Sequence, residues 1–243
     1  MPARPRTRSA KTTLSLDAIV AATLALVDEL GCEAVSMRRV SQAVQTGPAS
    51  LYVYVPDRGA LMALAHDLAV ADVRLPTDAD GDWRARLELL VDRAVAALAA
   101  HNDIATVGMT GTLPGPHILR ITEELLRLLR TGGISDAACA WAADLIGQYI
   151  ASSALEEAMW SRARRSQERS DGSPPEETTD KEEKAEEAFA ARLDALYRSL
   201  PAERYPTIRA LTPLLTGGDG ATRAAWKIRV LIDGLLATPH SDT

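Results

Sequence analysis

Residues 36–61 contain three arginines and two tyrosines around a short stretch of small side chains. A guanidinium can donate two parallel hydrogen bonds to a guanine edge or a phosphate, and a tyrosine hydroxyl is long enough to reach a phosphate. Small side chains let a helix approach base edges closely. The segment is therefore suited to binding a nucleic acid. The residues expected to contact it are Arg38, Arg39, Thr46, Gly47, Pro48, Ala49, Ser50, Tyr52, Tyr54 and Arg58.

The charge of the chain is unevenly distributed. The 243 residues carry a net charge of -6, but residues 1–60 hold seven Lys/Arg against five Asp/Glu. Residues 166–187 hold nine Asp/Glu against three Lys/Arg, so most of the acidity lies in one local run. The overall charge therefore does not exclude binding of a polyanion by the N-terminal segment.

Helical periodicity and capping residues indicate how this segment is positioned. Between residues 16 and 30, apolar residues recur at steps of three and four, with Ser15 suited to cap the start of the helix and Gly31 to end it. Ser36 can cap a second helix. Pro48 suits the first position of a third helix, because its missing N–H costs nothing there.

The third helix is expected to be about two turns long and to end near Tyr54, before a fourth helix begins at Pro56-Asp57. Three short helices with a tight break before the last predict a helix-turn-helix within residues 14–60, whose third helix enters the DNA major groove. The same periodicity is compatible with an ordinary helical bundle in which the tyrosines are partly buried. Residues 1–13 carry four basic residues and no acid, and we expect a disordered basic arm that adds charge along the DNA.

Residues 61–243 change to longer helical patterns. Ala, Leu, Arg and Glu dominate the chain and phenylalanine occurs once, which favours helix over sheet. We therefore expect an all-α fold, with a larger helical ligand-binding and dimerisation domain after the helix-turn-helix. Serine, proline and acidic residues predict a mobile acidic loop near 166–183. The longer helices are expected at residues 81–101, 115–131, 134–163, 184–199, 202–215 and 219–237.

Several classes of protein are disfavoured by the sequence. No apolar run reaches the ~20 residues of a membrane span, and the basic N-terminus lacks the apolar core of a signal peptide. Cys32 and Cys139 lie outside any CxxC or Cys/His cluster, and we interpret both as buried hydrophobes in a reducing cytosol. Residues 75–243 contain no GxSxG or HExxH motif and no phosphate-binding Gly-rich loop. We expect a cytoplasmic protein that is not an enzyme and needs no cofactor, metal or membrane.

The run VSMRRVSQAV, followed by GPASLYVYVPDRGALMALA, resembles the DNA-binding domain of the tetracycline-repressor (TetR) family. The family signature is a Leu-Tyr pair followed at fixed spacing by an aromatic or His residue, an Asn or Asp, a basic residue and a Leu. In this chain the signature reads LYVYVPDRGAL. Weaker resemblance continues in DWRARLELLVDRAVAALAAHND, GGISDAACAWAADLIGQYIASSALEE and AWKIRVLIDGLLA, closest to the subgroup of the tetracycline repressors themselves. The resemblance implies a two-domain helical transcriptional regulator that binds double-stranded DNA.

Two departures from the family pattern concern the DNA-reading segment. The turn usually holds Gly where this chain has Gln45, and a left-handed non-Gly residue costs about 1 kcal/mol. Gly47, two positions on, is expected to absorb part of the bend. The usual polar N-cap and base-reading residue are replaced by Gly47 and Pro48, which donate no side-chain hydrogen bonds. Specificity is therefore expected to depend on DNA shape and on Arg38, Thr46 and Ser50.

Small and apolar residues on the predicted inner faces of the longer helices leave room for a ligand, although they would equally allow close helix packing. In the tetracycline repressors the matching positions line the drug pocket. The resemblance therefore implies a small-molecule effector site here, with Arg74 and Glu156 as its polar groups. The residues implied are Arg74, Leu90, Ala94, Thr122, Leu125, Ala140, Ala143, Gly147 and Glu156.

The same resemblance argues against a bound metal. Tetracycline repressors hold a drug-chelated magnesium through a histidine whose place is Gly108 here, and Arg74 replaces the drug-contacting histidine. The implied effector is therefore a different one. It is mainly apolar and ring-containing, and it bears an acid or a phenol that Arg74 can pair with.

The helices expected over 134–163 and 219–237 are apolar on more than one side, so each needs partners on more than one side. Packed against their symmetry mates they would form a four-helix homodimer interface, unless both faces pack within the chain. A two-fold dimer presents its reading helices ~34 Å apart. We expect a repressor that binds a near-palindromic operator as a dimer and is released by its effector. An activator of the same design, an orphan regulator whose C-terminal domain binds a protein partner, and an all-helical enzyme stay open as alternatives.

Overall fold

The structure of the protein is a computed structural model, which describes residues 14–171, 178–218 and 220–237. The described residues form eleven α-helices and two short 3-10 helices and contain no strand, which confirms the expected all-α fold. The expected basic arm, residues 1–13, lies outside the described residues, and so do residues 172–177 of the acidic stretch. No helix among the described residues has the length and apolar character that crossing a membrane requires.

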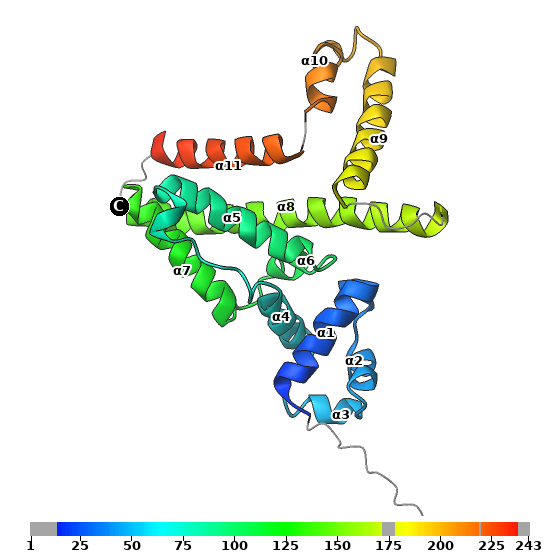
Figure 1. The fold of residues 1–243 in the computed structure, drawn as a ribbon, viewed down its shortest axis with the longest axis vertical. Coiled ribbons are helices and arrows are strands. Elements are labelled where there is room, and N and C mark those ends of the chain that lie inside the picture. The colour runs from blue at the N-terminus through cyan, green and yellow to red at the C-terminus, as the bar shows by residue number, and fades with distance from the viewer. Residues whose placement is uncertain (1–13, 172–177, 219, 238–243) are drawn as a thin grey trace, which may run out of the picture.

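The N-terminal part of the described chain, residues 14–57, forms a three-helix head (Figure 1). It comprises α1 (Leu16–Leu30), α2 (Met37–Ala43) and α3 (Pro48–Leu51), with the 3-10 helix η1 (Cys32–Ala34) between α1 and α2. The inner faces of these helices meet in an apolar core. Its fully buried members include Ile19, Val27, Val40 and Leu51.

The ends of α1 and α2 follow from local capping. The Ser15 hydroxyl accepts a hydrogen bond from the Ala18 N–H, and the Ser36 hydroxyl accepts one from the Arg39 N–H. Gly31 ends α1 with a φ of 81°, and its N–H donates to the Val27 carbonyl. All three predicted capping positions are therefore confirmed.

Helix α4 (Arg58–Ala69) joins the three-helix head to the rest of the molecule. Asp57 caps it, since its Oδ1 accepts a hydrogen bond of 2.8 Å from the Ala60 N–H. Helix α4, with Leu61 and Ala65 fully buried, packs on α1 and on α5, α6 and α7. One continuous hydrophobic core therefore runs from the head through α4 into the larger part of the chain.

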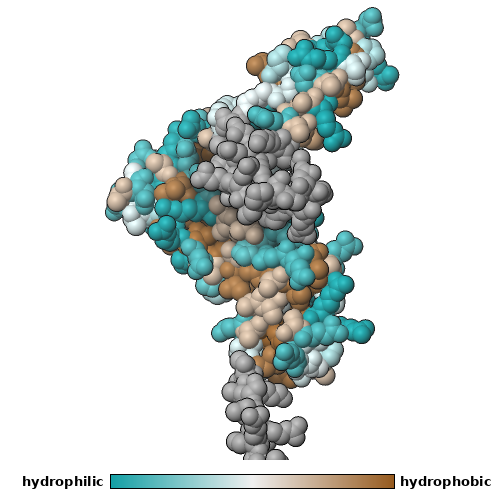
Figure 2. Space-filling view, turned by 45° about the vertical axis from the view of Figure 1, so that its right-hand side comes forward, coloured by the Kyte–Doolittle hydropathy of each residue, from teal (hydrophilic) through white to brown (hydrophobic). Residues whose placement is uncertain are grey.

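The larger part, here called the body, is built on α5 (Trp83–Ala99), α6 (Ala105–Gly108), α7 (Pro116–Thr131) and α8 (Asp136–Asp171). The 3-10 helix η2 (Asp78–Asp80) precedes α5. Figure 1 shows α8 as a long spine along which α5 lies, while α7 slopes from the start of α8 down toward α4. Hydrophobic residues on the face drawn in Figure 2 gather where the head meets the body.

Three further helices complete the body: α9 (Thr178–Ser199), α10 (Pro206–Thr216) and α11 (Gly220–Ala237). Helices α9 and α10 form a hairpin that projects away from α8, whereas α11 returns to lie beside α8 (Figure 1). Helices α8 and α9 extend further into the acidic stretch than apolar periodicity predicts. Glu, Lys, Arg and Gln are good helix formers, so the helix continues there without an apolar stripe.

Candidate nucleic-acid interface and the junction behind it

The turn between α2 and α3 has the strained conformation that the sequence predicted. Gln45 has a φ of 55°, in the left-handed region. The Thr46 N–H donates to the Ser41 carbonyl at 2.8 Å and the Gln45 N–H to the Gln42 carbonyl at 3.1 Å, which together close the end of α2. Gly47 has a φ of -83° and a ψ of 150°, ordinary extended backbone. The expectation that Gly47 absorbs part of the bend is therefore wrong, and Gln45 alone makes it.

Helix α3 is shorter than expected. It begins at Pro48, as predicted, but it ends at Leu51 after one turn, because the Tyr54 and Val55 N–H groups both return to the Leu51 carbonyl. No side chain caps its start, where Gly47 is the N-cap. Gly47, Pro48 and Ala49 are exposed, and Thr46 and Ser50 are half-buried. The small residues predicted to approach the bases therefore lie on the surface.

The aromatic and basic side chains around α3 divide into two groups. Tyr52 is 56% exposed and Arg38 is exposed, and neither side chain has a hydrogen-bonded partner among the described residues. In contrast, the Tyr54 hydroxyl donates to the Leu14 carbonyl at 2.8 Å, and Arg39 Nη1 donates to the Ala34 carbonyl at 2.6 Å. Of the predicted DNA contacts, Arg38 and Tyr52 are therefore the two long side chains with no hydrogen bond to the rest of the described chain.

Arg58 is bonded within the head as well. Its Nε donates to the Val35 carbonyl at 2.7 Å and its Nη2 to the Cys32 carbonyl at 2.5 Å. These two bonds hold the η1 turn against the start of α4. The guanidinium therefore organises the head although Arg58 is an exposed residue, a role that the sequence does not indicate.

A set of polar links, here called the head–body seam, ties α4 and α1 to the body. The first link joins Asp67 of α4 to the start of α7. Asp67 is 4% exposed, and its carboxylate accepts hydrogen bonds from the Ile118 N–H at 2.9 Å and the His117 N–H at 3.3 Å. Because the N-cap of α7 is Gly115, which has no capping side chain, Asp67 supplies the missing acceptor.

The close approach of Asp67 depends on Gly115. A Cβ atom at position 115 would lie 2.3 to 2.7 Å from the Asp67 carboxyl atoms, inside van der Waals contact. A second side chain of α7 strengthens the same link, since Arg120 Nη2 donates to the carbonyls of Val73 at 2.8 Å and Ala71 at 3.1 Å, just after α4. A side chain of α4 therefore bonds to the backbone at the start of α7, and a side chain of α7 bonds to the backbone just after α4.

The second part of the seam joins the turn between α5 and α6 to the end of α1. Asn102 Nδ2 donates to the Val27 carbonyl at 3.0 Å, and Asp103 Oδ1 accepts from the Cys32 N–H at 2.7 Å. His101 Nδ1 lies 3.0 Å from Asp28 Oδ1. Asn102 is 8% exposed and has a φ of 50°, so the left-handed conformation here positions a buried side chain.

His66 lies beside the seam, on α4. Burial lowers the pKa of its imidazole, an effect that the neighbouring Asp67 carboxylate partly opposes. A Cβ atom on Gly108 of α6 would lie 3.0 Å from the ring, so the absence of a side chain at position 108 lets α6 pack against His66. His66 is therefore a neutral packing group between α4 and α6 near pH 7.

The residues implied for the effector site are dispersed in the structure. Leu90, Ala94 and Leu125 are buried in the core, whereas Arg74 and Gly147 are exposed. Thr122 donates its hydroxyl to the Ile118 carbonyl, and Ala143 is half-buried on α8. Glu156 is exposed and lies 3.3 Å from Lys227 Nζ of α11.

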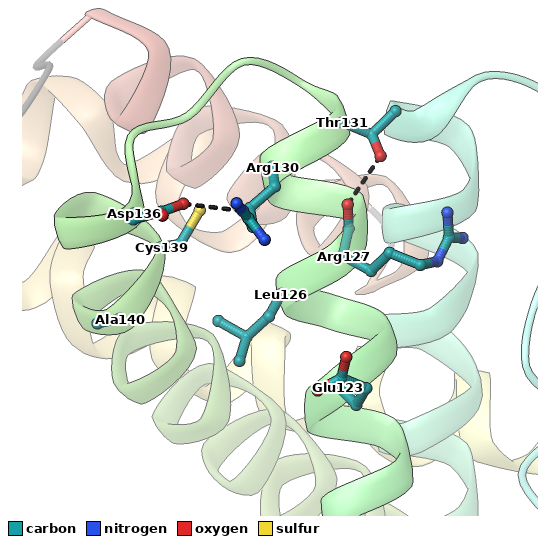
Figure 3. Close-up of a pocket in the computed structure, with 8 residues that line it drawn as sticks. All are labelled: Glu123, Leu126, Arg127, Arg130, Thr131, Asp136, Cys139 and Ala140. Atoms are coloured by element: carbon teal, nitrogen blue, oxygen red, sulfur yellow. Dashed lines mark hydrogen bonds and ion pairs between the residues drawn. The ribbon is translucent and has the colours of Figure 1, made fainter.

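A groove of about 660 Å³ opens between the second half of α7 and the start of α8, and Ala140 is the implied effector residue that lines it (Figure 3). Leu126 points into the groove from α7, and Cys139 lies on α8 opposite. An ion pair of 2.8 Å between Arg130 Nε and Asp136 Oδ1 spans the two helices. Arg127 turns away, toward Glu124, with which it makes a paired hydrogen bond. The groove is large enough for a drug-sized molecule.

The described residues do not form a cluster of side chains of the kind that binds a metal ion. Within the described residues, no group of three His, Cys, Asp or Glu side chains is placed to hold a metal ion. Cys32 and Cys139 are both buried and unpaired, and burial raises the pKa of each thiol, that of Cys32 to about 12.

Comparison with known proteins identifies the architecture. Residues 75–238 match the family model described as tetracyclin repressor-like, C-terminal domain. The chain belongs to the tetracycline repressor family. Because the match covers the whole body, the resemblance seen in the N-terminal signature extends through most of this TetR-family chain.

Three relatives illustrate the relationship. The TetR-family chain is 30% identical over 233 residues to the HTH-type transcriptional repressor DrrR1 of Streptomyces coeruleorubidus, an alignment that covers 96% of this chain and 81% of the relative. It is 29% identical to the TetR family protein ActR of Streptomyces coelicolor, whose crystal structure in complex with actinorhodin superposes with a TM-score of 0.74 and covers 93% of this chain and 97% of ActR. It is 28% identical over 152 residues to the class E tetracycline repressor protein of Escherichia coli, covering 59% of this chain and 69% of that protein.

The residues of the head–body seam were not found from the sequence. Asp67 and Ile118, or Asn102 and Val27, lie far apart in the chain, and no local pattern pairs them. One signal was present. A helix that starts at Gly115-Pro116 has no side chain of its own to cap its first amides, so a cap must come from elsewhere.

Proposed function

We propose that this TetR-family regulator is a ligand-responsive repressor that binds a near-palindromic operator as a homodimer. The exposed side chains around α3 support the DNA-binding part. Arg38 can fork onto a base edge or a phosphate, and Tyr52 can donate to a phosphate. Thr46 and Ser50, which lie on the α2–α3 turn and on α3, are half-buried and are proposed to contribute shorter contacts.

The head–body seam is the observation that carries the ligand-responsive part. Helix α4 is bonded to α7 through Asp67 and Arg120, and α1 is bonded to the α5–α6 turn through Asn102 and Asp103. A shift of α7 or α6 on ligand binding would therefore be transmitted to both helices that support α3. The effector changes DNA affinity to the extent that it binds the two arrangements differently.

The effector is proposed to be a mainly apolar, ring-containing molecule. ActR, which is similar over nearly the whole chain, has been crystallised with actinorhodin and with (S)-DNPA. Small and apolar residues line the inner faces of α5, α7 and α8 here, as the sequence indicated. The effector is expected to part these helices and to pair an acidic or phenolic group with Arg74.

The homodimer is proposed to form through α8 and α11. Trp141 and Leu145 of α8 are exposed, and so are Trp226 and Val230 of α11, which lies beside α8. Large apolar side chains that share one face indicate an interaction surface. A two-fold axis through this face would place two α3 helices on the same side of DNA.

The decisive experiment is selection of bound sequences from a random double-stranded DNA library at two stated salt concentrations. A two-fold symmetric enriched site supports the proposal and supplies a probe for anisotropy. Tyr52→Ala is then expected to weaken binding to every sequence, whereas Arg38→Ala is expected to change base preference as well. Arg130→Ala, on the far α7–α8 groove, is the matched control and is expected to bind as the wild type does.

Two outcomes would count against the proposal. Salt-sensitive binding with no enriched sequence would show that the α2–α3 turn does not read bases. Enrichment of an asymmetric site by a monomeric protein, measured by light scattering, would contradict the dimer while leaving DNA binding intact.

A further inference from the structure

A second cavity, of about 150 Å³, lies between the three-helix head and the body, apart from the α7–α8 groove. Both parts of the molecule contribute to its walls. Cys32, Arg58 and Met62 come from η1 and α4, and Thr106, Thr110 and Thr112 come from α6 and the segment after it. None of these residues is among those implied for the effector site.

The head side of the cavity supplies a cation. Two nitrogens of Arg58 are engaged, Nε with the Val35 carbonyl and Nη2 with the Cys32 carbonyl. Because Cys32 also lines the cavity, the second bond places the guanidinium at the cavity wall. Arg58 Nη1 has no hydrogen-bonded partner among the described residues, so its two N–H groups and the second N–H of Nη2 remain to donate to an anion.

The body side supplies hydrogen-bond acceptors. The Thr106 hydroxyl donates to the Asp103 carbonyl at 2.7 Å, the Thr110 hydroxyl to the Val107 carbonyl at 2.7 Å, and the Thr112 hydroxyl to the same carbonyl at 3.3 Å. Each hydroxyl proton is therefore used within its own segment. The lone pairs of three hydroxyl oxygens are left to accept hydrogen bonds.

The rest of the wall is apolar and uncharged. Met62 and Val107 are buried and line the cavity. Burial, followed by the charge of Asp103 and a hydrogen bond to it, raises the pKa of the Cys32 thiol to about 12, so the thiol itself is neutral at physiological pH. Two carboxylates flank the cavity from outside its lining: Asp103 Oδ1 accepts the Cys32 N–H at 2.7 Å, and Asp57 Oδ1 would lie 3.2 Å from a Cβ atom on the lining residue Gly59. A cavity of roughly 150 Å³ holds one aromatic ring.

We propose that this cavity binds a single-ring aromatic acid that carries a hydroxyl group, with the chemistry of a hydroxybenzoate. Its carboxylate accepts from Arg58, its hydroxyl donates to a threonine oxygen, and its ring packs against Met62 and Val107. Since one wall belongs to the head and the other to the body, the bound acid joins the two and stabilises their present arrangement. This second ligand occupies a site separate from that of the effector proposed above, and it is coupled to that effector only through the head–body arrangement that both would bias.

The test measures binding to the full chain without DNA, so its result does not depend on whether the protein is a repressor. Salicylate, 4-hydroxybenzoate, benzoate and phenol are titrated by calorimetry. At least one hydroxybenzoate is expected to saturate one site per chain. Benzoate and phenol, which lack one polar group each, are expected to bind at least about fivefold more weakly.

Variants locate the site. Thr110→Leu places extra atoms in the cavity and is expected to weaken hydroxybenzoate binding at least about tenfold. Thr112→Val removes one acceptor oxygen without adding bulk, and is expected to weaken it by a smaller factor. Thr131→Leu makes the same change in the α7–α8 groove and is expected to leave the affinity unchanged. Circular dichroism of each variant checks that it is folded.

Either of two results would overturn the proposal. The first is the absence of saturable binding by both hydroxybenzoates. The second is equal affinity in the wild type, Thr110→Leu and Thr112→Val with all proteins folded, which would place the bound acid elsewhere.

Discussion

The α2–α3 turn and the head–body seam each hold a non-glycine residue in the left-handed backbone conformation, but for different reasons. Gln45 is exposed, and the turn around it is closed by backbone hydrogen bonds alone. Asn102 is buried, and its side chain bonds to the end of α1. In the turn, therefore, the strained residue makes no side-chain contact that packing depends on. In the seam, the strained residue places a buried side chain that bonds to α1.

This difference extends to the rest of both regions. In the turn, Gly47 leaves the start of α3 uncapped and the side chains around it face outward. In the seam, Asp67 caps a helix of the body from a helix that supports the head. We infer that the side chains of the turn are available to a partner, whereas the bonds of the seam hold the head and the body in their present arrangement.

The largest effect is expected from Gly115→Ala. Its Cβ would displace the Asp67 carboxylate, and we expect the free energy of unfolding to fall by about 3 kcal/mol, as for an overpacked buried site. Urea denaturation measures this. Asp67→Ala alone should cost about 2 kcal/mol through the two amides left without an acceptor.

The double variant Gly115→Ala/Asp67→Ala sharpens that result. Without the carboxylate the new methyl group meets no clash, so the double variant should be no less stable than Asp67→Ala. Strict additivity of the two losses would contradict the direct contact between positions 67 and 115.

The next effect tests the Asn102 side chain. Asn102→Gly relieves the left-handed strain but removes the buried bond from Nδ2 to the Val27 carbonyl, which then keeps only the Gly31 N–H as a donor, so a net loss of about 1 kcal/mol is expected. Hydrogen exchange at the end of α1 should rise at the same time. If Asn102→Gly is more stable than the wild type, the Asn102 side chain does not offset its backbone strain, and the contrast drawn with Gln45 is wrong.

Gln45→Gly is the matched substitution in the turn, and its expected effect on the free energy of unfolding has the opposite sign. No side-chain bond is lost, and the free energy of unfolding should rise by about 1 kcal/mol. Thermal denaturation measures the gain. Gln45→Ala is the control, since it removes the same side chain without relieving the strain.

The smallest effect concerns pH. Burial holds the pKa of His66 below its ordinary value, so the unfolded chain binds the proton more tightly than the folded one. Stability should therefore decrease as the pH falls through about 6.5, the pKa of an unperturbed histidine. The variant His66→Gln should lose this part of the pH dependence of urea unfolding. An unchanged profile would show that His66 is not the group responsible.

The sequence predicted those features that depend on neighbouring residues. The caps at Ser15 and Ser36, the end of α1 at Gly31 and the start of α3 at Pro48 are all confirmed, since capping is a contact over three or four residues. The length of α3 was overestimated, because apolar and aromatic residues continue past Leu51 while the backbone turns.

What could not be predicted depends on contacts between distant segments. The bonds from Arg58 to Val35 and from Asp67 to Ile118 arise from tertiary packing, and they give each residue a role that its type alone does not indicate. The effector residues show the same limit. Small residues predict either a cavity or close packing, and in this structure Ala94 and Leu125 are packed.

The bond between the Tyr54 hydroxyl and the Leu14 carbonyl ties the residues just before α1 to the segment after α3. Leu14 is held next to α3 and the exposed Tyr52, while α11 ends at Ala237 beside the start of α8 (Figure 1). A purification tag added ahead of the N-terminus would therefore be joined, through residues 1–13, to the side of the head that we propose binds DNA. A polyhistidine tag there would compete with the proposed phosphate contacts, so affinity assays should use protein tagged after α11.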